Sequence, residues 1–236
     1  MSLDLRWTAT YTPTQDYAAL LTLLNPLGEV AQGETIHVCK DWPTSDWGRH
    51  ALAVGQHQIQ VDPHLPPAVY RVTLSMVEET TGKVLSPAQT IGTLEVSALE
   101  RRFTVPAMQH TTAATFGDAM VLLGYDLHHE ASILHLTLHW QALHRLDYYK
   151  IFVHLYDAQS GDLVVQSDTV PRQWSYPTNW WEAGEVVSDD VSLDLSELPA
   201  GHYRLAMGVY NPATGLRLTR PSGQDRLNLE EKIEIP

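Results

Sequence analysis

The sequence of 236 residues has little cysteine, little positive charge and no long apolar run. Its one cysteine, Cys39, excludes an intrachain disulfide and a cysteine-rich zinc site. Lysine and arginine number 15 against 28 aspartates and glutamates, which gives a formal net charge of −13. Because contact with nucleic-acid phosphates or anionic lipid needs a positively charged patch, we predict that the chain binds neither.

The apolar runs are also too short for a membrane span. Residues 18–24 and 119–123 are among the longest, well below the roughly 20 residues that cross a bilayer. The N-terminus has no basic segment followed by an apolar run, so no signal peptide is predicted. Taken at face value, these absences predict a cytoplasmic protein. The alternative is that the sequence is part of a longer protein. A hydrophobic content of 44% is enough for a buried core.

What the sequence does contain is two copies of one unit, offset by 133 residues. Residues 65–85 match residues 198–218 at 7 of 21 positions without a gap. The same offset relates residues 3–7 to residues 136–140. Further matches are Gly28 with Gly161 and Trp47 with Trp180. A single offset held across most of the half-chain indicates an internal duplication.

The two copies begin at different points. Residues 116–127 precede the first shared strand of copy two, and their counterpart would fall before residue 1. We therefore expect copy one to lack its first strand and the sequence to be truncated, with Met1-Ser2 a cloning remnant. The alternative is that copy one evolved without that strand. The predicted domains are residues 1–105, an incomplete repeat, and residues 106–236, a complete one.

The periodicity predicts strands rather than helices. Four apolar residues, Leu134, Leu136, Leu138 and Trp140, alternate with polar ones, which is typical of a strand with one buried face. Residues 149–156 are rich in β-branched and aromatic side chains, as an inner strand requires. Strands recur every 8–12 residues or so. We predict an all-β fold of two tandem antiparallel β-sandwiches, immunoglobulin-like or jelly-roll-like.

Aromatic residues concentrate in a loop of copy two. Stacking on the apolar face of a sugar needs exposed flat rings with polar groups beside them, and loops carry function more often than strands do. The candidate ligand-binding residues are Trp174, Tyr176, Trp180, Trp181 and Glu182. The alternative is that these rings pin a long loop to the sandwich. The recurrence of Trp-Pro-Thr at residues 42–44 as Tyr-Pro-Thr at 176–178 favours that alternative.

Metal ligation has weaker support. His135 and His139 share a strand face, and a site with His154 would need it on the neighbouring strand. Surface histidines explain these residues more simply. Oxygen ligands for calcium could come from Asp157, Asp162 and Asp168 or from residues 188–190, but neither set has the spacing of a calcium loop. No metal and no cofactor is predicted.

Catalysis has little support either. The sequence contains no Gly-x-Ser-x-Gly, P-loop or Gly-x-Gly-x-x-Gly motif. Glu182 and Glu185 flank a turn and could form the carboxylate pair of a glycoside hydrolase. Copy one has Gly48 and Arg49 after its tryptophan, so no acid is repeated there. We predict that the chain is not an enzyme and assign no catalytic residue.

Copy two carries a string of segments that resembles a known family. The segments are Phe116-Gly-Asp-Ala-Met-Val-Leu-Leu-Gly-Tyr-Asp126, Leu136-Thr-Leu-His-Trp140, Asp147-Tyr-Tyr-Lys-Ile-Phe-Val-His-Leu-Tyr-Asp157, Tyr176-Pro-Thr-Asn-Trp180, Gly184-Glu-Val-Val187 and Leu198-Pro-Ala-Gly-His-Tyr-Arg-Leu205. They resemble the C-terminal β-sandwich accessory domain of predicted polytopic membrane glycosyltransferases, of the dolichol-phosphate-mannose type, in green non-sulfur bacteria. The resemblance implies an extracytoplasmic or cell-surface location within a larger membrane protein. It implies no catalytic residue.

Together these observations predict a non-catalytic accessory module of a cell-envelope protein. Its expected partner is a polysaccharide, contacted through the loop aromatics, or an envelope protein. The alternative is a purely structural or protein-interaction module without a small ligand, and a glycoside hydrolase ranks below both.

Overall fold

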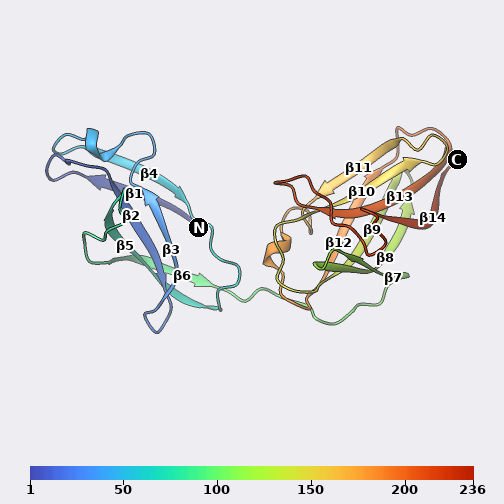
Figure 1. Cartoon of the computed structure of the whole chain (residues 1–236), viewed down its shortest axis with the longest axis horizontal. Coiled ribbons are helices and arrows are strands. Elements are labelled where there is room, and N and C mark those ends of the chain that lie inside the picture. Colours follow the sequence, from blue (N-terminus) through green and yellow to red (C-terminus); the bar gives the residue numbers. More distant parts are fainter. The chain divides into compact units, whose positions relative to one another are not determined.

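A computed structural model of the chain describes all residues from 1 to 236 and is all-β, as predicted (Figure 1). Every strand pairing is antiparallel. The chain divides into two compact units, Met1–Leu99 and Glu100–Pro236. Each unit has its own hydrophobic core.

The first unit has six strands and one short 3₁₀ helix. They are β1 (Ser2–Thr8), β2 (Tyr17–Leu24), β3 (Val30–His37), η1 (Thr44–Asp46), β4 (Leu52–Gln58), β5 (Ala68–Glu78) and β6 (Gln89–Val96). One sheet has the order β3-β2-β5-β6, and the other contains β1 and β4 alone. The core includes Leu21, Leu23 and Tyr70 of the larger sheet.

The second unit has eight strands in two four-stranded sheets. They are β7 (His110–Phe116), β8 (Met120–Glu130), β9 (Ile133–Ala142), β10 (Lys150–Asp157), β11 (Leu163–Thr169), β12 (Val186–Asp194), β13 (Gly201–Tyr210) and β14 (Leu227–Ile235), with the 3₁₀ helix η2 (Thr178–Trp180). The sheet orders are β12-β9-β8-β7 and β11-β10-β13-β14. The alternation predicted for β9 is confirmed, since Leu134, Leu136, Leu138 and Trp140 are at most 1% exposed.

The strand order decides between the two predicted sandwich types. The order β14-β13-β10-β11 is the G-F-C-C′ order of an immunoglobulin-like sandwich, and β8-β9-β12 is its A-B-E order. The hydroxyl of Tyr203 donates to the carbonyl oxygen of Pro199 at 2.7 Å, near the start of β13. Tyr70 makes the same bond to Pro66 at 2.8 Å in the first unit. A tyrosine in this place is a hallmark of immunoglobulin-like domains.

The elements of the first unit recur in order in the second. Strands β1 to β6 correspond to β9 to β14, and η1 corresponds to η2. The indole Nε1 of Trp47 donates to the carbonyl oxygen of Trp42 at 3.1 Å, and that of Trp181 donates to Tyr176 at 3.2 Å. Trp47 therefore corresponds to Trp181, and the predicted match with Trp180 was wrong by one residue. These matches agree with a duplication, which remains an inference.

The first unit lacks counterparts of both β7 and β8. The second unit has two strands ahead of β9, where the sequence predicted one. As a result, β1 pairs with β4 on one side only, whereas β9 pairs with both β12 and β8.

The boundary between the units lies earlier than the predicted boundary after residue 105. The backbone N–H of Val186 donates to the carbonyl oxygen of Arg102 at 2.7 Å. The guanidinium of Arg101 reaches the Glu185 carboxylate at 2.6 Å. Residues 100–105 therefore belong to the second unit.

Candidate binding loop, cavities and open strand edge

The loop that carries the candidate residues 174–182 is fixed to the sandwich of the second unit by its C-terminal part. The hydroxyl of Thr178 accepts a hydrogen bond from the N–H of Tyr149 and donates to the carbonyl oxygen of Asp147, each at 2.7 Å. The ring of Trp181 is fully buried. η2 thus turns the chain so that this indole enters the core.

Tyr176 belongs to a buried polar cluster. Its hydroxyl donates to Glu185 at 2.7 Å, and Glu185 also accepts from Arg101 at 2.6 Å and from the N–H of Glu182 at 2.9 Å. Burial and the neighbouring carboxylate raise the pKa of Tyr176 well above its usual value. Glu185 is fully buried and the Arg101 side chain is 16% exposed, so this ion pair holds residues 101–102 and the loop on the second unit.

Sugar stacking needs exposed rings, and the rings of Trp181 and Tyr176 are buried. Both rings pack into the core at the base of the loop. They therefore anchor the loop to the sandwich, which was the alternative to sugar stacking. Trp180 is half-buried, with its ring edge-on to Tyr176 at 6.2 Å between centroids. Glu182 forms a two-pronged ion pair with Arg145 at 2.9 Å, so Glu182 and Glu185 each have an arginine partner.

Trp174 is the one candidate ring that is largely exposed, at 56%. Arg172, Gln173 and Trp174 all have positive φ angles, between 53° and 70°. A run of left-handed residues without glycine is strained, and such strain clusters at functional sites. The ammonium of Lys150 lies 4.4 Å from the centre of the Trp174 ring.

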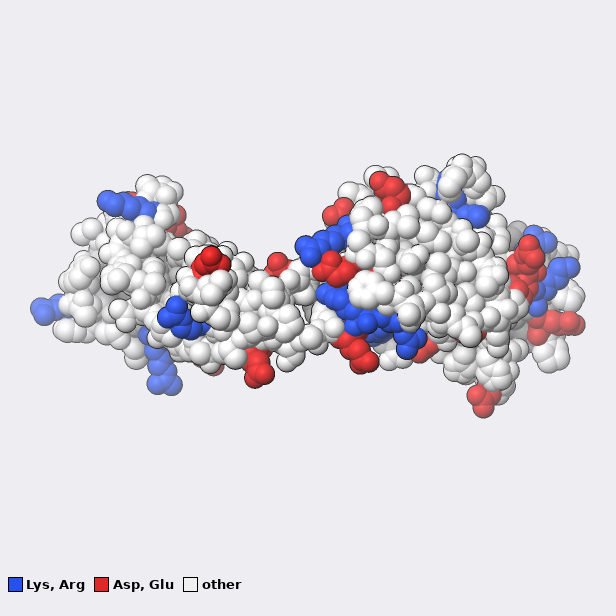
Figure 2. All heavy atoms as spheres, turned by 90° about the horizontal axis from the view of Figure 1, so that it is seen from below, with Lys and Arg blue, Asp and Glu red and all other residues white.

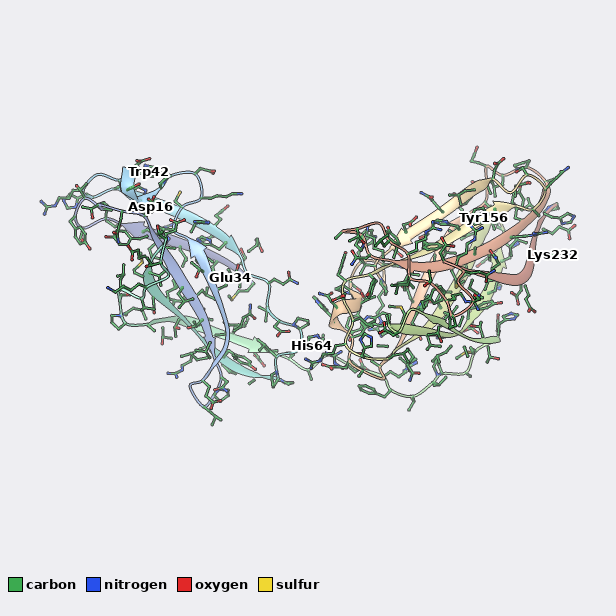
Figure 3. All side chains as sticks on the ribbon, viewed as in Figure 1. Asp16, Glu34, Trp42, His64, Tyr156 and Lys232 are labelled. Carbon is green, nitrogen blue, oxygen red and sulfur yellow. The ribbon has the colours of Figure 1, made fainter.

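The corresponding loop of the first unit is two residues shorter. Four residues separate Val38 from Pro43, and six separate Val170 from Pro177. The first unit still makes the equivalent indole-to-carbonyl bond, and its Trp42 packs against Trp47 at 5.3 Å. Trp42 and Asp16 lie near η1 in Figure 3. The longer turn that presents Trp174 is therefore not required to close the loop.

Beside this loop lies an open cavity of about 590 Å³ that belongs to the second unit. It is lined in part by Arg101, Arg102, Arg172 and Ser188. In the space-filling view, Lys and Arg atoms gather on the second unit with Asp and Glu atoms next to them (Figure 2). Arg101 is paired with Glu185, and Glu100 also lines the cavity. The positive charge of the cavity's arginines is therefore largely balanced.

The outer face of β9 carries cross-strand polar pairs. His139 contacts Ser188 on one strand and Asp126 on the other, both at 2.9 Å, and the hydrogen bond from His139 lowers the pKa of Asp126. These are the residue types of a Ser–His–Asp triad. The same His–Ser pair recurs between His135 and Ser192 at 3.0 Å without an acid. We therefore interpret the His139 contacts as ordinary cross-strand side-chain pairs of the sheet.

The metal-ligand sets considered from the sequence do not converge. His154 lies on β10, in the other sheet from His135 and His139, and it contacts Asp168 at 3.4 Å. Asp189 is buried while Asp190 is exposed, because successive residues of β12 face opposite sides. The Asp157 carboxylate accepts from the N–H groups of residues 159 and 160 in a turn. No group of three or more His, Cys, Asp or Glu side chains in the chain could hold a metal ion.

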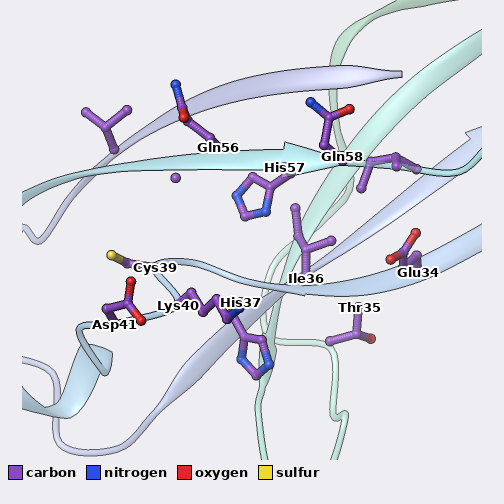
Figure 4. Close-up of a pocket in the computed structure, with 13 residues that line it drawn as sticks. Glu34, Thr35, Ile36, His37, Cys39, Lys40, Asp41, Gln56, His57 and Gln58 are labelled. Atoms are coloured by element: carbon purple, nitrogen blue, oxygen red, sulfur yellow. The ribbon is translucent and has the colours of Figure 1, made fainter.

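A cavity of about 680 Å³ lies between β3 and β4 of the first unit (Figure 4). His57 and Ile36 face it from the two strands, with Cys39 and Lys40 at one end. Burial lowers the pKa of His57.

Strand β1 pairs with β4 on one side only. Its core-facing residues Leu3, Leu5 and Trp7 are half-buried, whereas their counterparts on β9 are at most 1% exposed. A cavity of about 320 Å³ adjoins Trp7, lined by residues that include Ala9, Trp47 and Met76.

No protein-family model matches the chain, and no curated protein matches it. In structure, it is similar to the FN1–FN3 domains of chicken CNTN1, at 12% sequence identity and a TM-score of 0.27. The match covers 98% of this chain and 61% of that one, so the chain spans about three-fifths of the other's length. None of its helices is long and apolar enough to cross a membrane. The fold assignment therefore rests on the chain's own strand order and core.

Proposed function

We propose that the chain is a non-catalytic interaction module that binds other polypeptides. The observation that supports this proposal is the immunoglobulin-like sandwich of the second unit, in which the candidate carboxylates Glu182 and Glu185 are each paired with an arginine. Three of the four candidate sugar-stacking rings are buried or half-buried, which favours this function over a carbohydrate site.

A selection of random peptides on the full chain tests this function. We expect enriched peptides that bind the folded chain at least about tenfold more tightly than the heat-unfolded chain. Failure to enrich any peptide that requires the folded chain would overturn the proposal.

Carbohydrate binding at Trp174 is the second candidate. It is supported by the exposed ring on a strained turn that the first unit does without. Titration with polysaccharide pools, followed by indole N–H signals, should shift Trp174 and lose the shift in Trp174→Ala. Shifts that persist in this variant would refute a site at Trp174.

We also propose a location at the cell envelope, as an accessory domain within a larger membrane protein. The support is the resemblance of segments 116–205 to the glycosyltransferase accessory domain. Fractionation of the source cells, with protease protection of intact cells as the readout, tests this location. Recovery of the protein in the cytosolic fraction would refute it.

A further inference from the structure

Building on the proposed function, we propose that a cavity of the second unit binds a carboxylate of a partner polypeptide between Arg204 and Lys232. The cavity has a volume of about 420 Å³, and its lining includes residues of β10, β13 and β14. Tyr156 and Arg226 line it together with the two cations. Figure 3 shows the side chains of Tyr156 and Lys232 on the second unit.

Strand pairing places three of these side chains in one row. Arg204 lies directly opposite Tyr156 of β10 on one side and opposite Lys232 of β14 on the other. Tyr203 and Leu205, its neighbours along β13, are buried in the core, so the row lies on the outer face of the sheet. Directly opposite residues have Cβ atoms about 5 Å apart, and like charges there destabilise a sheet. An anion between Arg204 and Lys232 would relieve their repulsion.

The acids that line the cavity interact elsewhere. The Asp157 carboxylate accepts hydrogen bonds from the N–H groups of residues 159 and 160, at 2.9 and 2.7 Å. Glu231 accepts a hydrogen bond from the hydroxyl of Tyr125, on β8 of the other sheet. Burial, Glu231 and the charge of Glu230 together raise the pKa of Tyr125 well above its usual value. Both glutamates therefore act on the other sheet rather than bonding to the cationic row.

The three cations of the cavity form no ion pair with a carboxylate of the chain. Glu234, the next acid along this face of β14, lies opposite His202. Nη1 of Arg226 donates to the hydroxyl of Tyr156 at 3.0 Å, and the guanidinium lies 4.9 Å from the centre of that ring. A guanidinium has five N–H donors and pairs with a carboxylate through two parallel hydrogen bonds. Two guanidinium groups and one ammonium are therefore available to a carboxylate.

The first unit does not repeat this row. Arg71 is the counterpart of Arg204, and it lies between Leu24 of β2 and Thr93 of β6. An apolar and a neutral side chain thus stand where the second unit has a tyrosine and a lysine. Because the same three strands pair in the first unit without this row, the fold does not require it. Arg71 also provides a matched control, since it is an exposed arginine at the equivalent position.

The test titrates the full chain with the peptide acetyl-Gly-Phe-Glu-Glu-Gly-amide and follows backbone amide NMR signals. The control, acetyl-Gly-Phe-Gln-Gln-Gly-amide, removes both carboxylates and keeps the length. We expect the glutamate peptide to shift the amides of Arg204 and Lys232 and to bind at least about tenfold more tightly than the control. The glutamine peptide with a free C-terminal carboxylate is the third probe. Whichever carboxylate peptide binds more tightly at these amides identifies the source, an acidic side chain or a chain terminus.

Three variants locate the site. Arg204→Gln should weaken binding of the glutamate peptide about tenfold or more, because it removes the two-pronged donor. Lys232→Gln should weaken binding about threefold, and Arg71→Gln should leave it unchanged. Without peptide, Lys232→Gln should not lower the melting temperature, since it removes one member of a like-charge pair. A lysine that served only to stabilise the sheet would give the opposite result.

Three outcomes would overturn the inference. They are equal binding of the carboxylate peptides and the control, unchanged binding by Arg204→Gln, and tighter binding of polygalacturonate, which would make the ligand a polysaccharide. If selected random peptides bind the folded chain but carry no acid and tolerate Arg204→Gln, the proposed function stands and this site is wrong. If no peptide of either kind binds the folded chain, both fail.

Discussion

Replacing Arg101 with alanine tests how residues 100–105 are attached to the second unit. The substitution leaves the Glu185 carboxylate fully buried without a cation. Removing one partner of a buried ion pair typically costs roughly 3–5 kcal/mol. Two donors remain, the Tyr176 hydroxyl at 2.7 Å and the N–H of Glu182 at 2.9 Å. We therefore expect a loss near the lower end, about 3 kcal/mol.

Hydrogen exchange can report the stability of the two units separately. A loss of about 3 kcal/mol should speed exchange of core amides in β10 and β13 roughly 100-fold, where those amides exchange through unfolding of the second unit. Core amides of β2 and β5 belong to the first unit and should keep their rates. They provide an internal control in the same sample.

Arg102→Ala is the matched control. Arg102 is the next residue, exposed, and its backbone carbonyl still accepts from Val186 in the variant. We expect a change within about 0.5 kcal/mol. If Arg101→Ala costs less than about 1 kcal/mol, or no more than Arg102→Ala, the guanidinium does not stabilise buried Glu185 and the reasoning is wrong.

The remaining predictions concern stability. Trp181→Ala should lower the free energy of unfolding of the second unit by roughly 3–5 kcal/mol, because it empties a fully buried site. Trp174 is exposed, so Trp174→Ala should change this free energy by less than about 0.5 kcal/mol. Urea unfolding measures both. Burial raises the pKa of Asp189 to about 6 from 3.8, so the stability gained from its protonated form is complete below pH 3.8 and lost as the pH rises through 6. In Asp189→Asn, the fall in unfolding free energy over this range should shrink by up to roughly 3 kcal/mol, and an unchanged pH profile would contradict the assignment. Tyr203→Phe removes the donor to the Pro199 carbonyl and should cost about 1 kcal/mol, measured by thermal unfolding.

The loop aromatics show where prediction from sequence stopped. Tyr176 and Trp181 are large rings in a polar loop, a pattern common to a binding platform and to a loop anchor. The recurrence of Trp-Pro-Thr as Tyr-Pro-Thr favoured the anchor, and the indole-to-carbonyl bonds in both units show that geometry. Whether a loop ring points inward depends on contacts with residues distant in the sequence, such as Arg101 with Tyr176.

The sequence by itself determined the all-β class, and it predicted two repeated units. These are local properties, because alternation, turn residues and a constant offset are read along the chain. Only the tertiary structure decided that His154 lies in a different sheet from His135 and His139, and that Trp174 alone of the four candidate rings is largely exposed. It also decided that Leu3, Leu5 and Trp7 stay half-buried while their counterparts are enclosed. Burial depends on which strands cover a residue, and that is set by pairing between distant segments.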